Sequence, residues 1–117
     1  MRLAASIALV LFFLAPSFAD DSCKQTKFGA CFTVRGRYEV YADRETIWVI
    51  GTHRKLMVDD GWDSVRDAYG DDPEGYNHYV VGNFTVCPLR KAVPGEMRRV
   101  CVRQAVNLRR IPRKEPN

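Results

Sequence analysis

The clearest pattern along the chain is an alternation of apolar and polar residues that begins at Cys31. Every second residue from Phe32 to Val40 is apolar or glycine, and the residues between them are polar or charged. A period of two over ten residues is typical of a half-buried strand. Gly36 lies inside this pattern, so the sequence predicts a bulge or a sharp bend there, as at the corner of a small barrel.

Two apolar segments follow and predict further strands. Residues 46–50 are β-branched or aromatic, a composition typical of strands. Both faces of this segment are apolar, so either both faces are covered or Trp48 closes an open end of the core. Residues 56–58 are again apolar after a basic stretch, and they predict a further strand.

Residues 61–69 change to a helical period. Apolar residues recur there at three- and four-residue spacing, which marks one face of a short helix. Asp59 or Asp60 is expected to cap the start of this helix, where a side-chain oxygen accepts from free backbone N–H groups. Gly70 is expected to end it in a left-handed conformation.

Residues 76–88 and 97–106 predict the last two strands, the first of them interrupted at Gly82 and Asn83. Residues 109–117 are polar and contain two prolines, so they predict a C-terminal tail. Together these elements predict a mainly β fold, a small curled sheet or an OB-like barrel of about five strands with one short helix. A small β-sandwich is the alternative.

Residues 1–19 have the pattern of a secretory signal peptide. A basic start precedes a twelve-residue apolar run, and the small residues after it predict cleavage after Ala19. The run is too short to span a bilayer, which takes about 20 residues. We therefore expect a signal peptide over residues 1–19 and a single β domain over residues 20–108. We expect the mature chain to lie in the periplasm or to be secreted, with no transmembrane segment.

Four cysteines, Cys23, Cys31, Cys87 and Cys101, lie beyond the predicted cleavage site. An even number of cysteines in a small exported chain predicts disulfides. If the last two predicted strands form a hairpin, Cys87 and Cys101 face each other, which predicts a Cys87–Cys101 bond. Cys23 and Cys31 are then paired by elimination. The gaps between the cysteines are too wide for a typical zinc site, so the sequence predicts no metal.

Charge is segregated along the chain, whose net charge is +4 at pH 7. Residues 56–86 hold seven acidic residues against one arginine, whereas residues 87–117 hold nine basic residues against two glutamates. Such segregation can steer an anionic partner to one face of the protein. Alternatively, the two blocks lie close together and neutralise each other in the fold.

The only residues that suggest catalysis are two histidines. His53 or His78 could act as a general base if folding brings Asp43, Asp59 or Asp71 close. No serine lies in a nucleophile motif, so the sequence predicts no catalytic residue and no cofactor. The basic residues near the C-terminus lack interleaved aromatic residues, so no nucleic-acid partner is expected.

Four segments look like a group of small exported bacterial proteins with no assigned function: CFTVRGR at 31–37, IWVIGTHR at 47–54, FTVCP at 84–88 and VCV at 100–102. The resemblance implies a bacterial, Gram-negative periplasmic origin, and it transfers no active site. Its most distinctive positions are Gly36, Arg37, Gly51, Thr52 and Arg54. The glycines have a backbone explanation. For Arg37 and Arg54, a binding role and a partly buried ion pair both remain open.

These observations favour an exported small binding domain that recognises a protein or an anionic envelope component. The candidate binding residues are Arg37, Arg54, Arg99 and Arg103. One alternative function is a hydrolytic enzyme that uses His53 or His78 with an aspartate. The other alternative is a structural envelope protein.

Overall fold

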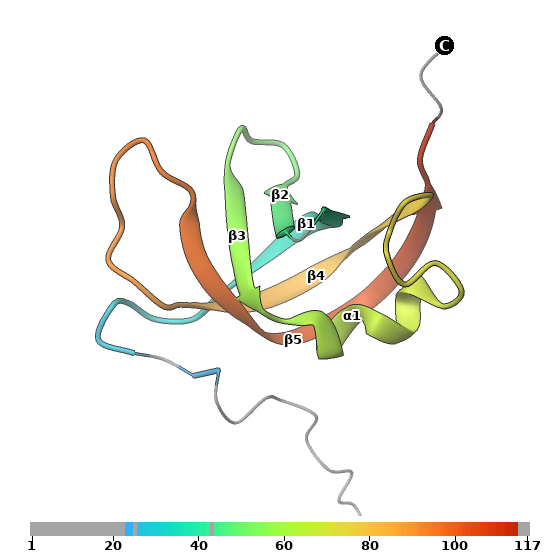
Figure 1. The fold of residues 1–117 in the computed structure, drawn as a ribbon. Coiled ribbons are helices and arrows are strands. Elements are labelled where there is room, and N and C mark those ends of the chain that lie inside the picture. The colour runs from blue at the N-terminus through green and yellow to red at the C-terminus, as the bar shows by residue number, and fades with distance from the viewer. Residues whose placement is uncertain (1–22, 25, 43, 115–117) are drawn as a thin grey trace, which may run out of the picture.

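Five strands and one helix follow one another along the chain in the computed structural model (Figure 1). They are β1 (Phe32–Tyr41), β2 (Arg44–Val49), β3 (Lys55–Asp60), α1 (Trp62–Tyr69), β4 (His78–Pro88) and β5 (Arg98–Pro112). The structure describes residues 23–24, 26–42 and 44–114. The predicted signal peptide and its cleavage site lie outside the described residues.

The strands form a closed barrel in the order β1-β2-β3-β5-β4. Four of the strand pairs are antiparallel, and β3 pairs with β5 in parallel. The crossover between these two parallel strands contains α1 and β4. The predicted OB-like barrel is thus confirmed, and the sandwich alternative is wrong. Each strand pairs with two others, although β5 pairs with β3 only from Arg98 to Cys101, and α1 also packs against β5.

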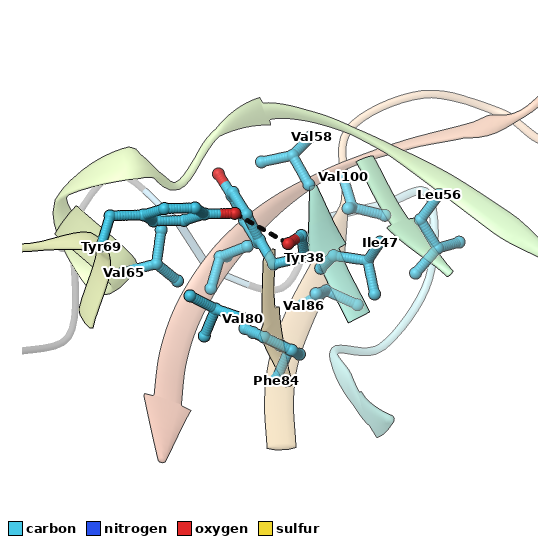
Figure 2. Close-up of a cluster of buried hydrophobic side chains, with 11 residues drawn as sticks. Tyr38, Ile47, Leu56, Val58, Val65, Tyr69, Val80, Phe84, Val86 and Val100 are labelled. Atoms are coloured by element: carbon cyan, nitrogen blue, oxygen red, sulfur yellow. Dashed lines mark hydrogen bonds between the residues drawn. The ribbon is translucent and has the colours of Figure 1, made fainter. Parts of the chain in front are cut away.

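The inward side chains of the strands fill the barrel, as the alternating pattern predicts. Tyr38, Ile47, Leu56, Val80, Phe84, Val86, Val100 and Val102 are all buried, and Figure 2 shows most of them pointing toward one another. Val65 and Tyr69 of α1 complete this cluster, so the helix covers one end of the barrel. The hydroxyl of Tyr69 donates to the backbone oxygen of Tyr38 at 2.8 Å. The helix is therefore held to the barrel by apolar packing and by a buried hydrogen bond.

Gly36 serves close packing rather than a bulge. The pairing of β1 continues without a shift through Gly36, which faces Val49 on one side and Gly82 on the other. A Cβ at position 36 would lie 2.5 Å from Ile47 Cγ2 and 2.9 Å from the Trp48 backbone oxygen. The predicted bulge is wrong, because the glycine is needed for room inside the barrel.

The helix starts without the predicted aspartate cap. It begins after Gly61, and no side chain caps its first turn. Asp59 is engaged elsewhere, because its carboxylate accepts three hydrogen bonds from Arg99. The predicted end at Gly70 is confirmed, and its φ of 57° is positive, but its ψ of −118° is not that of a left-handed helical residue.

Strand β5 runs beyond its predicted end at Val106. Residues 109–112 pair with the start of β4, between His78 and Val81. The alternation is lost on the way, because Asn107 has a positive φ and the register against β4 shifts between Val81 and Asn83. The break predicted at Gly82 and Asn83 is thus a local irregularity in one pairing of a continuous strand.

All four cysteines form disulfides, but the predicted pairing is wrong. The bonds are Cys23–Cys101 and Cys31–Cys87. The predicted hairpin register is correct, since Cys87 and Cys101 are direct partners in the β4–β5 ladder. Cys31 immediately precedes β1, and β1 also pairs with β4, so this cysteine reaches Cys87 from the other side. In the described part of the chain, no helix is long and apolar enough to cross a membrane.

Candidate anion-binding surface

Three residues on adjacent strands form a line across the outside of the barrel. Arg37 of β1 is the register partner of Trp48 of β2, and Trp48 is the partner of Lys55 of β3. Direct partners in a sheet point to the same face. The neighbours Tyr38 and Ile47 are fully buried inside the barrel, so these three side chains point outward.

The aromatic rings on this face hold the two cations. Arg37 Cζ lies 5.5 Å from the ring centroid of Trp48 and 5.1 Å from that of Tyr79, which comes from β4. Lys55 Nζ lies 4.3 Å from the Trp48 centroid. We call Arg37, Trp48, Lys55 and Tyr79 the cation–aromatic row. Each cation–π contact is worth about 0.5–1 kcal/mol at an exposed site, so the charges are held in place at little cost in hydration.

The position of Trp48 differs from the sequence-based expectation. The sequence suggested that both faces of this strand are covered or that Trp48 closes an open end of the core. Neither is the case, because the indole ring is not part of the barrel core. It is half-buried on the outer surface, between the cations of two neighbouring strands.

Arg37 also forms a partly buried ion pair. Its Nε lies 2.5 Å from Glu39 Oε2, and Arg113 Nη1 lies 3.3 Å from the other oxygen of the same carboxylate. One carboxylate thus serves two guanidinium groups. Lys55 has no ion-pair partner among the described residues, so the outer face keeps an excess of positive charge.

A cleft of about 330 Å³ continues the row at the end of the barrel opposite α1. It lies between the β2–β3 turn and the β4–β5 loop, which rise at the same end in Figure 1. Its lining residues are His53, Arg54, Lys55, Leu56, Gly95, Glu96, Met97 and Arg98. We call this the loop cleft. Lys55 belongs both to the loop cleft and to the cation–aromatic row, which makes the two continuous.

The N-terminal segment fixes one cation of the loop cleft. Arg98 Nη2 donates to the backbone oxygen of Phe28 at 3.0 Å. The Thr26 hydroxyl donates to the backbone oxygen of Pro88, which ties the same segment to the end of β4. Because the Cys23–Cys101 bond also anchors this segment, the disulfide helps to position the Arg98 guanidinium.

The four predicted binding residues separate into two groups. Arg54 lies in the loop cleft, and Arg37 lies in the cation–aromatic row. Arg99 is bound by Asp59, with Nη2 2.9 Å from Oδ1, and hydrogen bonding and charge attraction from this aspartate raise the pKa of Arg99. Arg103 is exposed on β5 and belongs to neither the row nor the cleft. The surface therefore uses two of the four predicted arginines.

The acidic and basic blocks of the sequence partly neutralise each other in the fold. Arg99 pairs with Asp59, and Arg110 Nη1 lies 2.8 Å from Asp71 Oδ1. The hydrogen bond and the charge of Arg110 lower the pKa of Asp71. Part of the C-terminal basic block is thus engaged in structural pairs, and the positive surface comes mainly from β1, β3 and the loops.

One histidine does find a carboxylate, but not a predicted one. His78 Nδ1 lies 2.9 Å from Asp72 Oδ2, and the same oxygen accepts from the backbone N–H of Asn77. Asp59 and Asp71 pair with arginines, and Asp43 lies outside the described residues. Within the described ranges, no hydroxyl or thiol hydrogen-bonds to His78. The pair closes the loop between α1 and β4.

Two other features of the structure have the outward form of a site. The sulfurs of Cys23, Cys87 and Cys101 lie within 4.8 Å of one another, but all three belong to disulfides and cannot act as thiolate ligands. A second cavity, of about 300 Å³, lies at the α1 end of the barrel and has no cation in its lining. Its lining residues are Val40, Ala42, Glu45, Trp62, Pro73, Glu74 and Tyr76. Neither feature offers binding chemistry comparable with the cation–aromatic row.

Comparison of the chain with protein-family models, with curated proteins and with solved structures finds no match.

Proposed function

We propose that this protein is an extracytoplasmic binding domain that recognises an anionic ligand through the cation–aromatic row and the loop cleft. The two disulfides support a location in an oxidising compartment. The apolar leader predicted at residues 1–19 supports export. The outer face of an OB-like barrel is also a common place for ligands to bind.

The observation that carries this proposal is the placement of Arg37 and Lys55 against the same indole ring. Exposed lysine and arginine side chains are normally mobile, and ordering them costs side-chain entropy when a ligand binds. Here Trp48 and Tyr79 hold the two charges before any ligand arrives. Such preorganisation is useful for binding an anion, and the same contacts also cover the indole ring.

The loop cleft adds to the positive field of this face. Arg54, Lys55 and Arg98 line it against a single carboxylate, Glu96. Charges of one sign that line a concave surface raise the local concentration of an oppositely charged ligand. The cleft therefore extends the anion-binding surface beyond β3.

Retention on immobilised heparin, a generic polyanion, tests the proposal. The unaltered chain is compared with Arg37→Gln and Lys55→Gln. The control is Arg66→Gln, which removes one charge from the exposed face of α1, where Arg66 pairs with Asp63. We expect the first two variants to elute at clearly lower salt than the control, because each removes a cation that a bound polyanion contacts.

Thermal unfolding of each variant shows whether the fold is retained. Lys55→Gln is the sharper variant, since Lys55 has no carboxylate partner among the described residues and its loss leaves no anion unpaired. If the unaltered chain is not retained at low salt, the proposal is wrong. It is also wrong if Lys55→Gln and Arg66→Gln elute together at the salt concentration of the unaltered chain.

A further inference from the structure

We infer that the ligand is an acidic polysaccharide that lies extended across the strands, with its charged sugars spaced to meet cations on every second strand. This inference rests on the proposed function and names the ligand class of the same surface.

A line of register partners runs around the outside of the barrel. Arg109 of β5 pairs with Val81 of β4, and Val81 pairs with Arg37 of β1. From Arg37 the line continues through Trp48 to Lys55. It crosses all five strands, with a cation at both ends and one in the middle.

The cations of this line lie on alternate strands. Neighbouring strands lie about 4.8 Å apart, so cations on alternate strands are about 10 Å apart. Arg37 Cζ and Lys55 Nζ lie 5.5 and 4.3 Å from the same Trp48 ring centroid, so these two charged ends are at most about 10 Å apart. A compact anion cannot reach all three cations of the line at once. A chain with one charge on every second sugar can meet them in sequence.

The indole ring of Trp48 is not free to stack on a base. Proteins that bind single-stranded nucleic acid on such barrels stack bases on free aromatic faces. The Trp48 ring lies between Arg37 and Lys55, so cations take the positions that bases would need. This favours a polysaccharide over a nucleic acid.

The loop cleft offers the polysaccharide a binding site beyond the cation–aromatic row. It begins at Lys55, and its volume of about 330 Å³ is at the lower end of the range for small-ligand sites. Arg54 and Arg98 line it together with His53, so a terminal acidic sugar would meet two further cations there. The polymer would therefore run from the cleft over Lys55 and Arg37 toward Arg109.

The test is a length series of hyaluronan oligosaccharides with two, four, six and eight sugars, which carry one carboxylate per pair of sugars. Affinity is measured by calorimetry at low salt. We expect a rise of about tenfold or more from the disaccharide to the octasaccharide, since each added ion pair at an exposed site contributes up to about 1 kcal/mol. Lys55→Gln and Arg109→Gln should each weaken the octasaccharide about threefold to fivefold and leave the disaccharide less affected.

Three results would overturn the inference. One is equal affinity for the disaccharide and the octasaccharide. Another is equal binding of an uncharged chito-oligosaccharide of eight sugars. The third is tighter binding of an eight-nucleotide oligothymidine, with a large shift of the Trp48 indole N–H resonance that indicates base stacking.

The two proposals fail in different ways. If heparin is retained through Arg37 and Lys55 but hyaluronan shows no dependence on length, the anion-binding function stands and only the polysaccharide assignment is wrong. If heparin is not retained, both are wrong.

Discussion

Trp48 shows how an apolar residue can serve a charged surface. Its ring is half-buried on the outside of β2, where exposure of a large aromatic group to water would be unfavourable. Arg37 and Lys55 cover it with their side chains and keep their charged ends near the ring. The same contacts therefore shield the indole and fix the charges, so stability and binding depend on one residue.

Asp72 is a residue whose charge contributes to stability. Burial raises the pKa of this carboxyl group, but hydrogen bonds from His78 and from the backbone N–H of Asn77 outweigh burial and leave the pKa below its ordinary value of 3.8. A carboxyl group with a lowered pKa in the folded state stabilises the protein at neutral pH. That contribution is lost as the pH falls through 3.8 toward the folded-state pKa.

We expect Asp72→Asn to lower the free energy of unfolding at pH 7 and to flatten its fall below about pH 5. Urea unfolding at several pH values measures this. Asp67→Asn is the matched control, since Asp67 is exposed on α1 and at 4.0 Å makes only a marginal contact with Arg66. The role of Asp72 is supported if the free energy of unfolding of Asp67→Asn depends on pH as in the unaltered chain and that of Asp72→Asn depends on pH less. Identical profiles for both variants would contradict it.

The C-terminal end of β5 is a strand because neighbouring elements stabilise it. Residues 109–112 begin with two arginines and do not continue the alternating pattern, yet they pair with the start of β4. Arg110 donates to the backbone oxygen of Tyr69, and Arg113 donates to that of Gly75, both in the α1–β4 region. The strand is therefore held by backbone pairing and by arginine contacts with the helix end.

We expect a chain that ends at Leu108 to be less stable by about 5 kcal/mol or more, because it loses the β4 pairing of residues 109–112 and the hydrogen bonds of Arg110 and Arg113, each worth about 1 kcal/mol. A chain that ends at Lys114 keeps all of these contacts and should unfold like the full chain. Denaturant unfolding of the two truncated chains measures the difference. Equal midpoints would mean that residues 109–114 do not stabilise the barrel.

The sequence predicts the elements of this fold better than the surface they build. Strands and helix follow from alternation within each segment, which is a local property. The end of β5 is missed because Asn107 interrupts the alternation and charged residues follow it. The cation–aromatic row is missed because its members lie on four strands.

One part of the row could have been found from the sequence. The turn between β1 and β2 has two residues, so Tyr41 pairs with Arg44, and counting back from the turn places Arg37 opposite Trp48. The contacts of Lys55 and Tyr79 require longer loops and the closure of the barrel. These cannot be derived from residue spacing alone.

For the whole molecule, the two disulfides compensate for a small core. The Cys31–Cys87 loop lies inside the Cys23–Cys101 loop, with sequence separations of 56 and 78 residues. Long loops lose much conformational freedom in the unfolded chain when they are closed. Both bonds join the N-terminal segment to the β4–β5 hairpin, at two residues that are direct partners in its ladder.

We expect Cys23→Ser with Cys101→Ser to lower the free energy of unfolding by about 4–5 kcal/mol, the value that chain entropy gives for closing loops of this size. Urea unfolding under oxidising conditions measures it. Cys31→Ser with Cys87→Ser should lower the free energy of unfolding by a similar amount.

The two double variants should differ in heparin retention. Retention should fall more in the variant that lacks the Cys23–Cys101 bond, because this bond anchors the segment that holds Arg98. The opposite order would contradict that link.

The register of the β4–β5 hairpin has a consequence for how the chain matures. Cys87 and Cys101 face each other and are only 14 residues apart, so a bond between them closes the shortest of the loops that involve either residue. We expect this bond to form early and to be the wrong one. Cys23 lies within reach of both sulfurs, so its thiolate can attack Cys101 and release Cys87 as a thiolate, which an external disulfide oxidant then joins to Cys31. Correct assembly would then depend on editing by thiol exchange, and a cell that lacks a disulfide isomerase should accumulate scrambled chains.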